Sequence, residues 1–177
     1  MKRIISFSFC LCMLAACNSE PAATVSSEKE KSESATPVQF PYTPAYTSTW
    51  TDSVSDQDVL TVLNSYKYWE TNDMKSLANV MADTVEFMSH SGFTYDGPKA
   101  GLLEMWTKSR DSLSKVTITV DAWRTGRSDK NHDIVSVWYK EIDTYKDGRV
   151  DSAYYEDDNV IANGKIVWYA QHKRILK

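Results

Sequence analysis

Two turn-forming dipeptides near the end of the chain constrain its fold more than any other feature. An Asp-Gly pair at 147–148 and an Asn-Gly pair at 163–164 each separate two stretches rich in β-branched and aromatic residues. Such pairs favour the two-residue turns that join neighbouring antiparallel strands. A further stretch upstream alternates apolar with polar residues, which is typical of a half-buried strand. The sequence therefore predicts an antiparallel meander whose four strands span residues 115–124, 134–145, 151–161 and 165–175.

The part of the chain before this meander has helical periodicity instead. Apolar residues recur at helical spacing after Ser55 and again after Asp73, and both residues are of a type that caps helix N-termini. A strand is expected over 84–89, and a third helix is expected to begin at Pro98 and to end near residue 113. These elements predict an α+β fold, with three N-terminal helices on one side of a strongly bent, mainly antiparallel sheet.

This order of elements resembles the nuclear transport factor 2-like superfamily, with its SnoaL-like and ketosteroid-isomerase branches. The segments that carry the resemblance are ETNDMKSLANVMADTVEFM at 70–88, TYDGPKAGLLEMW at 94–106 and NGKIVWY at 163–169. The resemblance implies a cone-shaped half-barrel over 53–177, whose interior is often a ligand cavity. It does not imply an activity, because this scaffold carries isomerases, dehydratases, hydrolases, ligand binders and association modules.

The first 52 residues are expected to direct the protein to the cell envelope and to anchor it there. Two basic residues precede an apolar run and the sequence LAAC, which resembles a bacterial lipobox ending at Cys17. We expect residues 1–16 to be a signal peptide, Cys17 to be acylated with fatty chains such as palmitate, and residues 17–52 to be a flexible tether rich in Ser, Glu, Lys and Pro. The expected location is the cell envelope, anchored by lipid, at an outer membrane and facing the periplasm or the exterior.

Composition excludes several classes of function. All three cysteines lie within the first 17 residues, so the domain is expected to have no disulfide, no thiolate metal site and no cysteine nucleophile. The formal net charge is −4 and no basic block is present, which disfavours nucleic acid as a partner. The histidines His90, His132 and His172 lack the short spacing of metal ligands. We expect no metal and no cofactor.

Candidate catalytic residues come mainly from the resemblance. The base of the isomerase branch would fall at Ser89, which cannot serve as that base, with His90 beside it. A second family acid would fall on the strand that contains Glu156 and Asp157, and a slip of one residue decides which of them faces inward. The tyrosine donor of the first helix would fall near Ser65, with Tyr66 adjacent.

Aromatic residues give the stronger indication of a pocket. Aromatic walls with a few polar groups suit an apolar ligand. On the last expected strand, Tyr169 shares a face with Val167 and Gln171, and the resemblance implies that this face lies inside. Trp168 would then lie on the outer face of the sheet, which favours a homodimer formed through that face. The residues expected to line the pocket are Tyr66, Trp69, Trp106, Trp138, Tyr154, Tyr169 and Gln171.

Three interpretations remain open at this point. The first is a lipid-anchored domain whose aromatic pocket binds a small apolar ligand without evident catalysis. The second is an isomerase, cyclase or hydrolase that uses Glu156 or Asp157 as base, helped by Tyr66 or His90. The third is a dimeric interaction module whose core is filled.

The anchor generates the first testable prediction. Substituting Cys17→Ala removes the thiol that would carry the lipid, so the chain is expected to move from the membrane fraction to soluble or unprocessed forms. Fractionation of the cells that express it, followed by immunoblotting, measures this. Unchanged membrane association of the variant would contradict the lipoprotein assignment.

Overall fold

The computed structural model describes residues 48–175, which belong to one compact unit, Tyr42–Lys177. The expected signal peptide, Cys17 and most of the expected tether lie outside the described residues. No helix within residues 48–175 is long and apolar enough to cross a membrane. The helices are α1 (Asp56–Thr71), α2 (Met74–Val80) and α3 (Lys99–Asp111). The strands are β1 (Ser48–Trp50), β2 (Met81–Met88), β3 (Thr94–Pro98), β4 (Leu113–Ser128), β5 (Asp133–Tyr145), β6 (Val150–Ala162) and β7 (Lys165–Ile175).

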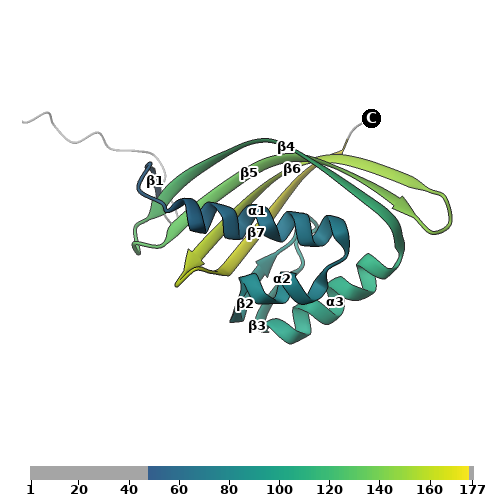
Figure 1. Ribbon diagram of the computed structural model, residues 1–177, viewed down its shortest axis with the longest axis horizontal. Helices are drawn as coiled ribbons and strands as arrows, with labels where there is room; N and C mark the ends of the chain where they lie inside the picture. Colours follow the sequence, from purple (N-terminus) through teal and green to yellow (C-terminus); the bar gives the residue numbers. More distant parts are fainter. Residues whose placement is uncertain (1–47, 176–177) are drawn as a thin grey trace, which may run out of the picture. The chain divides into compact units, whose positions relative to one another are not determined.

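The strands form one curled, open sheet in the order β1-β4-β5-β6-β7-β2-β3. All neighbouring pairs are antiparallel except β2 and β7, which are parallel. The long strands β4 to β7 arch over the three helices (Figure 1). The predicted α+β class, the three helices and the four-stranded meander are therefore confirmed.

The structure corrects several boundaries. Strands β1 and β3 were not expected, and β3 lies between the expected strand over 84–89 and the third helix. Pro98 ends β3 and caps α3, which begins at Lys99, since the extended backbone of Pro98 (ψ 133°) is not helical. Strand β4 is longer than predicted at both ends because it continues past its alternating segment to pair with β1 and with the end of β5.

Helix caps form as the sequence indicates, and a buried arginine supports one helix end. The side chains of Ser55 and Asp73 accept hydrogen bonds from the backbone N–H groups of residues 58 and 76, at 3.1 Å and 2.9 Å. At the other end of α1, the guanidinium of Arg110 donates to the carbonyl oxygens of Trp69 (2.9 Å) and Glu70 (3.0 Å). This positive group on α3 donates to terminal carbonyls of α1, where Trp69 also accepts from the backbone N–H of Asn72 at 3.2 Å, and it joins α1 to α3.

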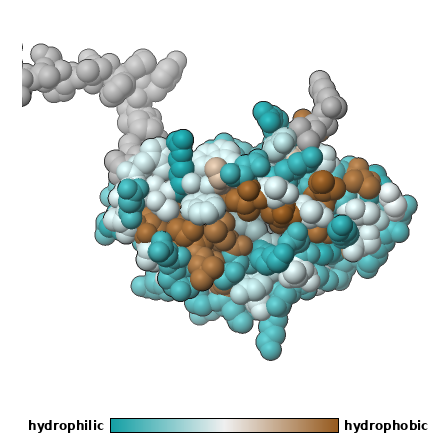
Figure 2. Space-filling view, turned by 45° about the horizontal axis from the view of Figure 1, so that its top comes forward, coloured by the Kyte–Doolittle hydropathy of each residue, from teal (hydrophilic) through white to brown (hydrophobic). Residues whose placement is uncertain are grey.

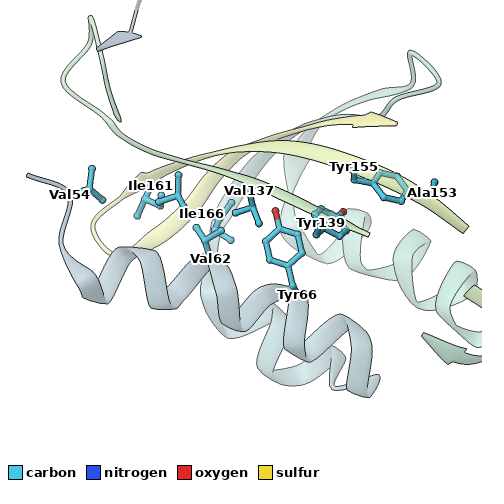
Figure 3. Close-up of a cluster of buried hydrophobic side chains, with 10 residues drawn as sticks. Val54, Val62, Tyr66, Val137, Tyr139, Ala153, Tyr155, Ile161 and Ile166 are labelled. Carbon is cyan, nitrogen blue, oxygen red and sulfur yellow. The ribbon is translucent and has the colours of Figure 1, made fainter. Parts of the chain in front are cut away.

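The core lies between the helices and the concave face of the sheet. One buried cluster joins α1 to the meander strands, and a second surrounds Leu102 of α3 and Val85 of β2. In Figure 3, Val62 and Tyr66 of α1 reach toward the side chains of the strands. On the outer surface, apolar side chains appear in patches between hydrophilic ones (Figure 2).

A bulge in the last hairpin changes which residues face inward. The register shifts between Val160 and Ile161, so that Ile161 pairs with Ile166, while Val160 pairs with Trp168. Simple alternation along β7 would place Ile166 with Trp168 on the outer face. Ile166 is instead buried in the core. Val167 is the extra, unpaired residue of the bulge, so Ile166 and Trp168 point to opposite faces of the sheet.

Candidate functional site

A cavity of about 460 Å³ lies between α1, α3 and the concave face of the sheet. Its interior is not filled by side chains, so the interpretation of an interaction module with a filled core does not fit the structure. Pairs of rings form much of its wall: Phe87 stacks on Tyr169 with centroids 5.3 Å apart, and Tyr139 stacks on Tyr155 at 5.2 Å. The indole of Trp106 meets the first pair edge-on. A wall of this composition suits an apolar or aromatic molecule.

The carboxylate of Asp157 lies beneath this wall and is fully buried. Its Oδ2 accepts hydrogen bonds from the hydroxyl groups of Tyr66 (3.2 Å), Tyr139 (2.7 Å) and Tyr169 (2.6 Å). The three tyrosines line the cavity, and they come from α1, β5 and β7. Its other oxygen, Oδ1, is buried and has no partner. Three elements of the fold therefore converge on one carboxylate of β6.

Amide side chains extend this network to the edge of the cavity. The Nδ2 group of Asn159 donates to the hydroxyl oxygen of Tyr66 (3.1 Å) and to a backbone carbonyl. The Nε2 group of Gln171 donates to the hydroxyl oxygens of Tyr169 (3.1 Å) and Tyr139 (3.4 Å). Its Oε1 lies 3.0 Å from Nδ1 of His90, an exposed residue that also lines the cavity.

Burial sets the protonation of this cluster. Desolvation raises the pKa of Asp157 to about 7, while the three tyrosine hydrogen bonds act in the opposite direction. Desolvation also raises the pKa values of Tyr66, Tyr139 and Tyr169 well above the usual value, and the negative charge of Asp157 adds to the effect. The tyrosines therefore keep their protons at neutral pH, and Asp157 is the group of this cluster that can exchange one.

A second pair of acids lines the cavity on β5. The pKa of Glu141 is raised to about 8. Burial is the main cause, and the negative charges of Asp143 and Asp157 add to the shift. Burial also raises the pKa of Asp143, whose Oδ1 is buried without a partner. Glu141 is consequently protonated at neutral pH. The sequence analysis missed this pair, although both acids stand at alternate positions after Tyr139 and so share its face.

The register of β6 decides between the two acids that the sequence left open. Residues 153, 155, 157, 159 and 161 are buried, whereas Glu156 is exposed on the outer face opposite Trp138 and His172. Asp157 is therefore the inward acid, and Glu156 cannot reach the cavity.

Most of the predicted pocket residues meet at the cavity, and two do not. Trp138 precedes the inward Tyr139 and therefore lies on the outer face, where the guanidinium carbon of Arg124 is 5.8 Å from its ring centroid. Tyr154 likewise lies on the outer face, where the guanidinium carbon of Arg174 is 5.1 Å from its ring centroid. Sequence analysis had placed both inside because it assigned no register to β5 and β6. The predicted pocket residues that line the cavity are Tyr66, Trp69, Trp106, Tyr169 and Gln171, and the catalytic candidate His90 lines it as well.

Within residues 48–175, no group of three or more His, Cys, Asp or Glu side chains could hold a metal ion. The side chains that line the described site include acids, hydroxyl groups, amides and aromatic rings. Such a set can bind an apolar molecule and can move a proton through Asp157 or Glu141.

Comparison with known proteins supports the fold. No family model matches the sequence, and no curated protein matches it significantly. Among solved structures, an NTF2-like protein of unknown function from Burkholderia pseudomallei is 15% identical, with a TM-score of 0.52 over 68% of this chain and 92% of that one. An LEH-like epoxide hydrolase of Mycobacterium tuberculosis is 6% identical, with a TM-score of 0.57 over 67% of this chain and 83% of that one. TerC, co-crystallised with polyporic acid, is 17% identical, with a TM-score of 0.55 over 67% of this chain and 92% of that one.

The chain thus has the nuclear transport factor 2-like fold, and the predicted fold is confirmed. At these levels of identity the likeness extends to the fold alone.

The protonated Glu141 generates a prediction about stability and pH. Its folded-state pKa of about 8 exceeds the ordinary 4.5, so the folded protein binds this proton more tightly than the unfolded chain. The free energy of unfolding should therefore fall as pH rises from about 4.5 to 8, and Asp157 should contribute in the same direction up to about pH 7. Glu141→Gln, which resembles the protonated acid, should make this fall shallower. Urea denaturation at several pH values measures it.

Glu156→Gln is the matched control, because this carboxylate is exposed on the outer face and should leave the pH dependence unchanged. Parallel curves for the wild type and Glu141→Gln would contradict the assignment of a buried, protonated acid.

Proposed function

We propose that this protein binds a small, mostly apolar molecule in the cavity between its helices and the concave face of its sheet. The observation that carries the proposal is the cavity itself, whose volume of about 460 Å³ lies in the usual range for small-molecule sites. Stacked and edge-on rings supply much of its wall, and polar groups such as Tyr169 and Gln171 are hydrogen-bonded to one another. One protein of similar fold, TerC, was crystallised with polyporic acid, which supports a ligand of this general kind.

The proposed setting is the bacterial cell envelope, at an outer membrane, with the domain tethered through a lipid on Cys17. The basic start, the apolar run and the LAAC sequence support this part of the proposal. The proposed assembly is a homodimer through the outer face of the sheet. The half-buried Trp168 and Val160 lie side by side on that face, and Met88 there is 44% exposed, which supports an apolar contact.

Retention of a ligand tests the main proposal. Native mass spectrometry of the chain purified from its own cells is expected to show non-covalent excess mass that disappears on denaturation. Trp106→Ala removes a ring from the cavity wall and should abolish the excess mass. Trp138→Ala removes an indole of the same size from the outer face and should leave it unchanged. Equal retention in both variants would contradict the pocket assignment.

A second candidate function is acid–base catalysis by an isomerase, cyclase or hydrolase, and the environment of Asp157 favours it. This carboxylate has a pKa raised to about 7 and is surrounded by three tyrosine hydroxyls that line the cavity. A group with such a pKa can accept and return a proton at neutral pH. The resemblance implies that the family's base position is Ser89, which cannot serve as a base. Asp157 does not itself line the cavity, so it would have to act through the tyrosines that separate it from the cavity.

Turnover of enolisable ketones and of epoxides tests this second candidate. Asp157→Asn is expected to lower the rate by roughly 10²-fold or more, as loss of a general base does. Glu156→Gln should keep the wild-type rate, since its side chain is on the opposite face. Full activity in Asp157→Asn would exclude Asp157 as the base.

A further inference from the structure

The hydrogen bonds around Asp157 determine the orientation of the polar groups that connect it to His90 at the cavity's edge. A carboxylate only accepts hydrogen bonds, so the single hydroxyl protons of Tyr139 and Tyr169 are directed to its Oδ2. Protonation of Asp157 at Oδ1, which has no partner, leaves these donors in place. On their other side, both hydroxyl oxygens therefore present only lone pairs.

This fixes the amide of Gln171 and, through it, the imidazole of His90. The end of Gln171 that lies 3.1 Å and 3.4 Å from the two hydroxyl oxygens has to be the donating NH₂ group. Its carbonyl oxygen then faces Nδ1 of His90 at 3.0 Å. A carbonyl cannot donate, so Nδ1 carries the proton. A neutral imidazole has only one N–H, which leaves Nε2 as an acceptor.

His90 holds this acceptor at the edge of the cavity. Its ring lies edge-on to Tyr155, with centroids 6.2 Å apart, and the residue lines the cavity together with Gln171 and Phe93. Among the aromatic groups of this wall, a basic nitrogen offers a bound molecule a directional contact that the ring faces do not.

We propose that Nε2 of His90 accepts a hydrogen bond from a hydroxyl or phenol group of the ligand, and that Gln171 is the positioning residue that keeps Nε2 free of a proton. The ligand class is then a small aromatic or apolar molecule that carries at least one hydroxyl group. This inference rests on the proposed function for its ligand, whereas the state of His90 is independent of it.

The tautomer of His90 is measurable without any ligand. Long-range ¹H–¹⁵N NMR spectra of the full chain, recorded above the pH at which imidazole is protonated, distinguish the two neutral forms. The chain has only three histidines, so single His→Gln variants assign the signals. His90 is expected to be the Nδ1–H form, and Gln171→Met should shift it toward the Nε2–H form that free histidine favours.

His172 serves as the internal control, because its Nδ1 lies 3.3 Å from the backbone carbonyl of Glu156 on the outer face. Its tautomer should not respond to Gln171→Met. An Nε2–H form of His90 in the wild type, a measurement that needs no variant to fold, would overturn the inference. An unchanged His90 tautomer in a folded Gln171→Met variant would overturn the positioning role of Gln171.

A matched pair of probes tests the ligand class. 2-Naphthol and 2-methylnaphthalene have nearly the same shape, and only the first has a hydroxyl group. Calorimetric titration should show that His90→Phe lowers the ratio of their affinities about fivefold, the effect of one net hydrogen bond. An unchanged ratio would overturn this inference alone. Binding of neither probe would overturn the proposed function and this ligand class with it.

Discussion

Folding removes the carboxylate of Asp157 from water, and three tyrosine hydroxyls replace the hydration that it loses. A buried carboxylate without such donors would cost several kcal/mol, or would remain protonated at neutral pH. Because Tyr66 comes from α1 while the other two tyrosines come from β5 and β7, these hydrogen bonds fix the helix against the concave face of the sheet. The packing of Val62 and its neighbours adds stability that is not directional, whereas the carboxylate specifies where the helix must lie.

The same interaction determines what the cavity offers to a ligand. The hydroxyl protons of Tyr139 and Tyr169 are directed toward Asp157, so these two residues present ring faces and lone pairs to the cavity rather than hydroxyl donors. These lone pairs orient the amide of Gln171, whose carbonyl oxygen in turn faces Nδ1 of His90. Glu141 differs from these groups, since it lines the cavity as a protonated acid and can donate a hydrogen bond. The cavity therefore combines an apolar body with an acceptor at one edge and an acidic donor on β5.

Sequence reasoning predicted the class of fold because its signals are local. The turns at 147–148 and 163–164 and the cap at Ser55 act over a few residues and occur where expected. The choice between Glu156 and Asp157 was different, because it depends on the pairing register of β5, β6 and β7, which no local pattern encodes. The bulge at Val160 and Ile161 likewise arises only when two strands pair. Trp138 and Tyr154 were assigned to the wrong face for the same reason. Glu141 could have been found by applying the alternation of β5 to its acids as well as to its aromatic residues.

The fold leaves the activity open, since the same scaffold carries enzymes and binding proteins, and the cavity is the feature that separates a binding function from a packed core. A crystal structure of the protein purified from its own cells, with no ligand added, tests this claim most directly. A binding function predicts electron density for a non-protein molecule between Trp106, Tyr169 and Tyr139, with the tyrosine hydroxyls still directed at Asp157. A cavity closed by repacked side chains, with the helices moved onto the sheet, would contradict it.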